Sequence, residues 1–350
     1  RPRGTPQLYG QGGSCEPPIT EGSYIMARVN GYFINLNDKM LTKDDTRKIA
    51  TEIIGDENIK KVKEQGQVDL ALTINENRFR VNAYNQKGGL ALSIRVIPNK
   101  ILSFEELGLP DILNTLINKE KGLILITGQT GSGKSTTLAS IINKINATKQ
   151  KHIITIEDPI EYIHKHKNSL INQKEVGVDT PSFDLALKSC LRQDPDIILI
   201  GEMRDKETIK NVLTAVETGH LVFSTLHTNS ASKSIDRIVD VFSENEKNEI
   251  RYQLSTVIEA IISQQLINKK DEKGRVVATE VMIANDAIRN LIRENKTYQI
   301  QNVIQTSSNI GMKSMDQDLL NLYDEGLISK ESLLSNCNNL EYIENRIRND

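Results

Sequence analysis

From residue 111 onward, short runs of consecutive apolar residues alternate with stretches of helical periodicity. The runs are Leu123–Thr127, Ile153–Ile156, Ile197–Ile200, Leu221–Leu226 and Val276–Ile283. Apolar runs without polar alternation are typical of strands covered on both faces. Because strands and helices alternate along this part of the chain, we predict an α/β fold with a mostly parallel, doubly wound sheet.

Before residue 98 the pattern changes, because apolar and polar residues alternate as they do in half-buried antiparallel strands. An Asn-Gly pair at 30–31 predicts a two-residue hairpin turn within residues 22–36. A helix is expected over residues 43–54, with Thr42 and Asp45 in a capping arrangement. Further strands are expected at Val68–Ile74, Phe79–Tyr84 and Leu90–Ile97. We therefore predict a small α+β domain with an antiparallel sheet.

These patterns divide the chain into four parts. Residues 1–18 lack periodicity and are interpreted as a flexible leader or a remnant of expression. The small domain then spans residues 19–98, a linker or hinge spans 99–110, and the α/β domain spans 111–350. Its last part, 286–350, is expected to be helical, with helices at 286–294, 297–306, 314–325 and 329–336.

Composition adds that the chain is of the globular class. Hydrophobic residues make up 38% and charged residues 26%, with 44 Lys and Arg against 46 Asp and Glu. A nucleic-acid binder usually carries a basic excess, so this balance argues against nucleic acid as a partner. No apolar run approaches the roughly 18 residues of a membrane span, no signal peptide is recognisable, and the three cysteines are isolated. We expect a cytoplasmic protein.

A phosphate-loop motif follows the first buried-type strand. Residues 128–135 (GQTGSGKS) fit the pattern G-x-x-x-x-G-K-[ST] at every fixed position, and a helical pattern comes next. Lys134 is expected to reach the β- and γ-phosphates of ATP, and the Ser135 hydroxyl to hold Mg²⁺. The nucleotide-binding residues predicted here are Gly128, Gln129, Thr130, Gly131, Ser132, Gly133, Lys134, Ser135 and Thr136.

Two groups of carboxylates follow other apolar strands. The apolar strand Ile197–Ile200 is followed by one glycine and then by Glu202. A strand that ends in this way can bring an acid to the metal beside a phosphate loop. An isolated acid at this position could equally be a solvated strand-end residue. Three more acids lie within five residues of the segment 155–162 (TIEDPIEY). In that segment, Asp158 suits a helix cap and Glu161 suits a general base, and both interpretations stay open.

Histidines and arginines complete the candidate chemistry. His220 precedes the strand Leu221–Leu226 and His227 ends it, where a histidine could sense the γ-phosphate or be only structural. The His164/His166 pair has no further metal ligand near it in sequence and is interpreted as surface. Arginines that could act on phosphate from a neighbouring subunit, or form only surface ion pairs, are Arg78, Arg80, Arg95, Arg192 and Arg204.

Together these motifs resemble those of the secretion and type IV pilus ATPase superfamily. The segments GQTGSGKST, TIEDPIEY, IILIGEMRD and TGHLVFSTLHT match its Walker A motif, Asp box, Walker B motif and His box in that order. RFRVNAY (78–84), AIRNLIRE (287–294) and GMKSMDQDL (311–319) narrow the resemblance to the retraction ATPases, the PilT family. It covers the chain from about residue 22 to about residue 335.

The resemblance implies a PAS-like domain followed by a RecA-like domain, six copies of which form a homohexameric ring. ATP would bind between the two domains of one subunit and be completed by the next. It further implies that Glu161 is the general base, Glu202 the Walker B acid, His220 and His227 the His-box residues, and Arg78, Arg80 and Arg95 phosphate ligands. The implied partner is an inner-membrane pilus platform protein, engaged at the cytoplasmic face.

Two departures from the family's pattern bear on this interpretation. The segment GGSCEPPIT stands where the family has a first strand, so that strand is expected to be replaced or lost. The four-cysteine zinc module common in assembly and secretion ATPases has no counterpart in this sequence, which favours retraction of a pilus over its assembly. An assembly or secretion ATPase remains the alternative, ahead of a RecA-type nucleic-acid motor and of a nucleotide-dependent switch without turnover.

Overall fold

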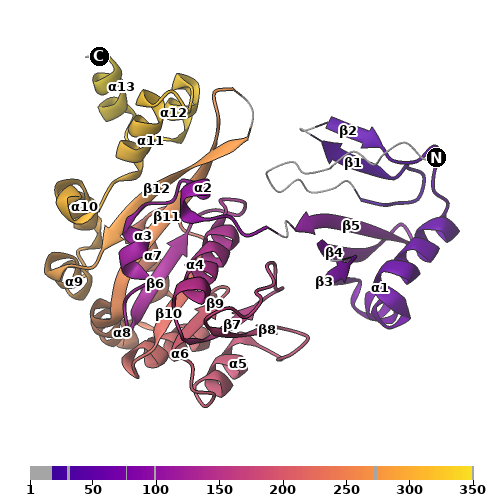
Figure 1. Cartoon of the computed structure of the whole chain (residues 1–350), viewed down its shortest axis with the longest axis horizontal. Coiled ribbons are helices and arrows are strands. Elements are labelled where there is room, and N and C mark those ends of the chain that lie inside the picture. Colours follow the sequence, from indigo (N-terminus) through magenta and orange to yellow (C-terminus); the bar gives the residue numbers. More distant parts are fainter. Residues whose placement is uncertain (1–17, 30–31, 76, 98–99, 272–273, 349–350) are drawn as a thin grey trace. The chain divides into compact units, whose positions relative to one another are not determined.

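The computed structural model describes the chain except for residues 1–17, 30–31, 76, 98–99, 272–273 and 349–350. It consists of two compact units, divided between Lys100 and Ile101 (Figure 1). The predicted Asn30–Gly31 turn, and the leader apart from its last residue, lie outside the described residues.

The smaller unit is a helix packed on an antiparallel sheet, with a separate hairpin. Its elements are β1 (Met26–Val29), β2 (Tyr32–Asn35), α1 (Lys43–Gln65), β3 (Gln67–Ile74), β4 (Asn77–Gln86) and β5 (Gly89–Ile97). β4 lies in the middle of the three-stranded sheet and pairs with both neighbours. Alternate residues of β4, Val81 and Ala83, are fully buried and belong to one core with Ala50 and Val62 of α1. The predicted small α+β domain is confirmed.

The helix α1 is longer than expected. Thr42 and Asp45 form the predicted capping box, with the Thr42 Oγ1 atom accepting from the Asp45 N–H at 3.2 Å. The first helical part ends at Gly55, whose φ of 74° and ψ of 162° are not helical, and a second part runs on to Gln65. At the sheet edge where a first strand was expected to be lost, Ile19 forms only an isolated bridge with Leu92.

The larger unit is built on a seven-stranded sheet in the order β12-β11-β6-β10-β9-β7-β8. All neighbouring strands are parallel except β11 and β12, which form an antiparallel hairpin. Its strands are β6 (Gly122–Thr127), β7 (His152–Glu157), β8 (Leu170–Glu175), β9 (Ile197–Ile200), β10 (Leu221–Leu226), β11 (Ile258–Asn268) and β12 (Arg275–Ile283). The mostly parallel sheet is therefore confirmed, and with the phosphate loop the fold is that of a RecA-like P-loop domain.

Helices cover this sheet on both faces (Figure 1). Those on one face are α2 (Phe104–Leu107), α3 (Ile112–Leu116) and α4 (Lys134–Thr148), and those on the other are α5 (Phe183–Cys190), α6 (Lys206–Glu217), α7 (Ala231–Asp240), α8 (Glu244–Val257), α9 (Asp286–Arg293) and α10 (Ile300–Thr306). In β6, Ile124 and Ile126 pack in the core that faces α2–α4. Leu123 and Leu125 pack in the core on the other face, against α5–α10. All four side chains are fully buried, which explains the unbroken apolar run.

The C-terminal helices form a third cluster against β11 and β12. They are α11 (Met315–Asp324), α12 (Lys330–Asn336) and α13 (Leu340–Arg348), preceded by the short 3-10 helices Thr297–Gln299 and Ser308–Ile310. Their core contains Met315, Leu319, Leu333 and Ile343 together with Ile267 of β11. Within the described part of the chain, no helix is long and apolar enough to cross a membrane.

Three features of the larger unit differ from expectation. Residues 101–110, which the sequence suggested as part of a linker, pack into this unit, where Phe104 and Leu109 are buried in the α2–α4 core. The strands β8 and β11 and the helix α13 were not predicted. The strand β12 was predicted, but it is the antiparallel edge strand of the sheet.

Candidate active site

The phosphate loop leaves β6 at the carboxyl edge of the parallel strands. Residues 128–133 connect β6 to α4, which begins at Lys134. Gly128 has a φ of 150°, and a Cβ atom there would lie 2.4 Å from Ser132 Oγ and 2.5 Å from the Gln264 carbonyl oxygen. Only glycine allows this close approach. Tight turns of this kind direct successive N–H groups toward an anion, and the positive end of α4 adds to the attraction.

Lys134 is the centre of the site. Its side chain is buried, and Nζ donates to the carbonyl oxygens of the first two loop residues at 2.8 and 3.0 Å. Nζ also lies 3.5 Å from His227 Nδ1. Burial lowers the pKa of Lys134, and the negative charges of Glu202 and Glu161 oppose that shift. Lys134, Glu202 and His227, all predicted from the sequence, therefore meet at one place, and the charge of Glu161 reaches Lys134.

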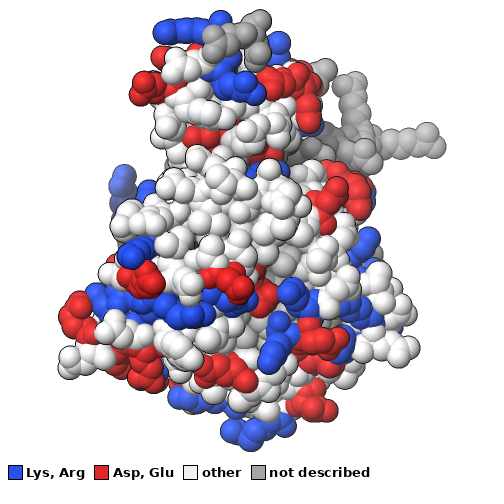
Figure 2. Space-filling model, turned by 90° about the vertical axis from the view of Figure 1, so that its left-hand side faces the viewer, with Lys and Arg blue, Asp and Glu red and all other residues white. Residues whose placement is uncertain are grey.

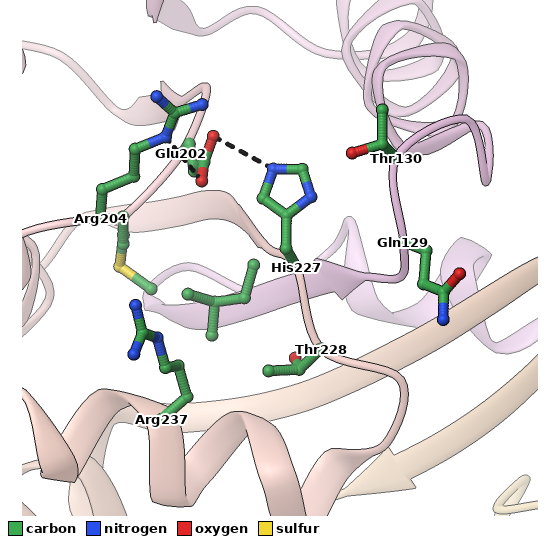
Figure 3. Close-up of a pocket in the computed structure, with 9 residues that line it drawn as sticks. Gln129, Thr130, Glu202, Arg204, His227, Thr228 and Arg237 are labelled. Carbon is green, nitrogen blue, oxygen red and sulfur yellow. Dashed lines mark ion pairs between the residues drawn. The ribbon is translucent and has the colours of Figure 1, made fainter.

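Glu202 follows β9 and lies between the side chains of Arg204 and His227 (Figure 3). Its carboxylate lies 2.8 Å from Arg204 Nε and 3.3 Å from His227 Nε2. Burial favours the neutral acid, but the hydrogen bond from Arg204 and the charge of His227 outweigh it, so the pKa of Glu202 is below its usual value. Glu202 is therefore ionised at neutral pH, as an acid that orients a metal or polarises water must be.

A pocket of about 830 Å³ opens beside these groups. In Figure 3 the side chains of Gln129 and Thr130 lie on one side of it, and those of Glu202 and Arg204 on the other. Its volume is within the range of small-molecule sites. The lining residues are Gln129, Thr130, Glu202, Met203, Arg204, Leu226, His227, Thr228 and Arg237.

Ser135 and Glu202 supply the type of donor that Mg²⁺ requires. Mg²⁺ is bound through one or two protein oxygens, completed by substrate phosphates and waters. Among the described residues, no group of three or more His, Cys, Asp or Glu side chains is arranged to hold a metal ion. The hydroxyl and carboxylate here thus fit Mg²⁺ that is bound together with a nucleotide, and not a closed site made by protein alone.

The acidic loop after β7 is attached to α4 and to β8. The Tyr162 hydroxyl lies 3.0 Å from Thr136 Oγ1, and the Ile160 N–H donates to Glu175 Oε2 at 3.0 Å. Glu161 lies close enough to Lys134 to influence the pKa of that lysine, whereas Asp158 is exposed. These contacts favour Glu161 over Asp158 as the chemically active acid, and its role as a base remains a prediction.

Gln173 of β8 was missed from the sequence, and it fixes the acidic loop. Its Nε2 donates to the Tyr162 carbonyl oxygen at 2.8 Å and to Glu157 Oε1 at 3.2 Å. Its Oε1 accepts from the His164 N–H at 2.8 Å. One amide thereby holds the main chain of the loop on both sides of Ile163, directly after Glu161.

Replacing Gln173 by leucine is expected to lower kcat about tenfold and to leave nucleotide affinity unchanged. The loop loses the bonds that align Glu161, whereas the phosphate loop is untouched, and small misalignments of a base are costly. Steady-state phosphate release and equilibrium ADP binding measure the two quantities. Asn172→Ala, on the opposite face of β8, is the matched control. Weaker ADP binding with an unchanged kcat would contradict this role for Gln173.

Glu157 introduces a pH dependence of stability. Burial of this half-buried carboxyl raises its pKa to about 7, although hydrogen bonds from Thr155 and Gln173 act in the opposite direction. In the unfolded chain the pKa is close to 4.5. Between these two values the unfolded chain releases a proton that the folded chain retains, so stability falls as pH rises through this window.

We therefore expect Glu157→Gln to raise the midpoint of thermal unfolding at pH 8 relative to the wild type. The gain should shrink as the pH is lowered through this window and be smallest at its acid end, because below pH 4.5 the wild-type carboxyl becomes protonated in the unfolded chain as well as in the folded one. Thermal unfolding of both proteins between pH 4.5 and 8.5 provides the measurement. A difference that is constant across this range would show that Glu157 does not titrate in the folded protein.

The structure does not bring His220 into the site. His220 precedes β10 and His227 follows it, so the length of the strand, about 20 Å, separates them. The Nδ1 atom of His220 lies 2.7 Å from the Ala215 carbonyl oxygen, near the end of α6. The His164/His166 pair is only partly at the surface: His164 is half-buried, and burial lowers its pKa to about 4.

The predicted arginines of the smaller unit share one face of its sheet. Arg78 and Arg80 alternate along β4, and Arg95 of β5 is the direct partner of Arg80. Arg80 also pairs with Asp69 at 2.7 Å, and Arg78 donates to Thr73 at 3.2 Å. Three guanidinium groups on one face form a concentration of positive charge, and their action on phosphates remains a prediction. Of the two arginines expected near the Walker B strand, Arg204 lines the pocket and Arg192 does not.

Comparisons with known proteins agree with these motifs. A sequence model of the type II/IV secretion system protein family matches residues 51–331. The chain is 49% identical to the twitching motility protein of Neisseria gonorrhoeae, covering 90% of this chain and 85% of that protein. It is 48% identical to the type IV pilus retractation ATPase PilT of Pseudomonas aeruginosa, covering 91% and 93%.

A solved structure extends the likeness to three dimensions. A crystal structure of the pilus retraction motor PilT with bound ADP matches with a TM-score of 0.88 at 45% identity, covering 97% of this chain and 96% of that one. Both units of the chain therefore have counterparts in it. The chain belongs to the type II/IV secretion system protein family.

Proposed function

We propose that the chain is an ATP-hydrolysing motor that drives type IV pilus retraction as a hexamer. The observation that carries the proposal is the meeting of Lys134, Glu202 and His227 at a phosphate loop. It occurs in a chain that is 48% identical, over nearly its whole length, to a pilus retraction ATPase. The lysine, carboxylate and histidine suit phosphoryl transfer. That hydrolysis drives pilus retraction is inferred from the named function of the relative.

In this proposal each residue acts on the transfer of the γ-phosphoryl group to water. Lys134 and the loop N–H groups neutralise the phosphate oxygens. Ser135 and Glu202 would hold Mg²⁺, which would supply positive charge against the phosphates. Glu161 accepts a proton from the attacking water as the bond to the β-phosphate oxygen breaks and ADP leaves. His227, paired with Glu202, is positioned to respond to loss of the γ-phosphate.

The hexamer and its partners belong to the same proposal. Arg78, Arg80 and Arg95 would contact phosphates in a ring and stabilise the charge that spreads over the transferring group. The motor would act on an inner-membrane pilus platform protein at the cytoplasmic face, where hydrolysis around the ring moves that partner. On the face seen in Figure 2, positive side chains mostly adjoin negative ones, which does not favour nucleic acid as the partner.

AIRNLIRE lies on α9, where its two arginines bind the end of α8. Arg289 donates to the Ser255 and Thr256 carbonyl oxygens at 2.7 and 3.0 Å and pairs with Glu259 at 2.9 Å. Arg293 donates to Ser255 Oγ at 3.0 Å. These contacts lie at the start of β11, beside the start of β6, whereas the phosphate loop follows the end of β6. That position is consistent with a role of this motif in the work done by the motor and not in hydrolysis.

Deleting the gene in the source organism and counting surface pili tests the proposal. We expect more pili and loss of twitching, both reversed by the wild-type gene but not by Glu202→Ala. Cells without pili would instead make the chain an assembly ATPase, the alternative that shares every catalytic motif. Purified chain that binds ATP without releasing phosphate would make it a nucleotide-dependent switch.

A further inference from the structure

Gln264 of β11 is a buried polar side chain that contacts the phosphate loop from within the larger unit. Its exposed fraction is 1%, and β11 lies beside β6, the strand from which the loop departs. Neighbouring hydroxyls join the two strands, because Thr127 Oγ1 donates to Ser263 Oγ at 2.8 Å. Gln264 therefore belongs to a strand whose position relative to the loop is fixed.

Both polar atoms of the Gln264 amide form hydrogen bonds, one with the phosphate loop and one with the helix α4 that follows it. Its Nε2 donates to the Ser132 carbonyl oxygen at 2.6 Å, within the loop. Its Oε1 accepts from Thr137 Oγ1 at 3.0 Å, in the first turn of α4. A Cβ atom on Gly133 would lie 3.2 Å from Nε2, so the loop backbone and the amide are packed against each other. Asn is too short and Glu lacks the donor, so glutamine suits this position.

Lys134 Nζ holds the start of the loop through the Gly128 and Gln129 carbonyl oxygens, and the Gln264 amide holds its end. The Ser132 hydroxyl is buried and has no hydrogen-bond partner among the described residues. The bond from Gln264 to the Ser132 carbonyl is thus the side-chain contact that sets the direction of this peptide group. A peptide group whose carbonyl points back toward β11 presents its N–H on the opposite side, toward the phosphates.

We propose that Gln264 is a positioning residue that keeps the phosphate loop in its binding-ready shape before nucleotide arrives. The inference rests on the proposed nucleotide site. Without this bond, only a fraction of molecules has the loop in the competent shape, and the apparent Kd rises by the inverse of that fraction. Saturating nucleotide restores the competent shape, because the phosphates select it. Loss of Gln264 therefore weakens binding and leaves kcat largely intact.

The test measures ADP binding and steady-state ATP hydrolysis for the full chain and its variants. Gln264→Met keeps the length and removes both hydrogen bonds, and we expect the Kd for ADP to rise about tenfold with kcat within about twofold. Thr137→Val removes only the bond to α4 and should raise Kd about threefold. Gln265→Met is the matched control, because the Gln265 side chain points to the opposite face of β11 and makes no hydrogen bond within the described part of the chain.

The outcomes separate this inference from the proposed function. An unchanged Kd in Gln264→Met, or an equal rise in Gln265→Met, would overturn the inference while the nucleotide site stands. A fall in kcat at saturating ATP with an unchanged Kd would also overturn it. A wild-type chain that binds no ADP would overturn the nucleotide site and the inference together. The smaller rise in Thr137→Val checks the inference independently, because that variant preserves core volume and the bond to Ser132.

Discussion

Replacing Lys134 by alanine is expected to lower kcat/KM for ATP about a thousandfold. The Lys134 ammonium is held in advance by the Gly128 and Gln129 carbonyl oxygens, at 2.8 and 3.0 Å, and it lies in a buried site where charge is weakly screened. A positioned donor of this kind contributes about a hundredfold to a thousandfold through the transition state. The alanine variant also loses ground-state attraction to the phosphates, so both binding and turnover suffer.

The measurement for Lys134 is phosphate release over a range of ATP concentrations. Lys144→Ala, on the same helix α4 but away from the loop, is the control and should hydrolyse ATP at the wild-type rate. Thermal unfolding of both variants checks that they fold. More than a tenth of wild-type kcat/KM in Lys134→Ala would mean that the phosphate loop is not the site of hydrolysis.

Glu161→Gln is expected to lower kcat about a thousandfold while ADP binds with wild-type affinity. Glutamine has nearly the shape of glutamate but cannot accept the proton of the attacking water, and general bases contribute about a hundredfold to ten-thousandfold. The phosphate loop that binds ADP keeps all its contacts. Rapid-quench kinetics of ATP hydrolysis and calorimetry of ADP binding measure the two effects separately.

Asp158→Asn is the matched control for Glu161. Asp158 lies three residues earlier in the same acidic loop, and its side chain is exposed. We expect this variant to hydrolyse ATP at nearly the wild-type rate. If Asp158→Asn loses activity and Glu161→Gln keeps it, the base has been assigned to the wrong acid of the loop.

The parts of the fold that the sequence predicted are those with a strong local pattern. Strands β6, β7, β9 and β10 each carry a run of apolar residues because helices cover both faces of the sheet. The strand β8 (LINQKE) lies at the edge and is mostly polar, so it carries no such run. The strand β11 follows α8 without an intervening residue, and no Gly or Pro marks where the helix ends.

The candidate site was predictable where a motif is contiguous and not where a residue comes from elsewhere in the chain. Lys134 and Ser135 lie within one eight-residue pattern, and Glu202 ends an apolar run. Gln173 and Gln264 each hold a loop through one amide that comes from a separate strand, and an isolated glutamine gives no signal in sequence. His220 and His227 lie close in sequence but at opposite ends of β10, which a motif cannot reveal, and the role of His220 stays a prediction.

The most direct test of the central claim is to watch individual labelled pili in living cells that lack the gene. Complementation with the wild type is predicted to restore shortening of extended pili, whereas Glu161→Gln, produced at the same level, should leave pili extended and static. Pili that shorten at the wild-type rate with Glu161→Gln, or that shorten equally well without the gene, would contradict the claim that hydrolysis at this site powers retraction.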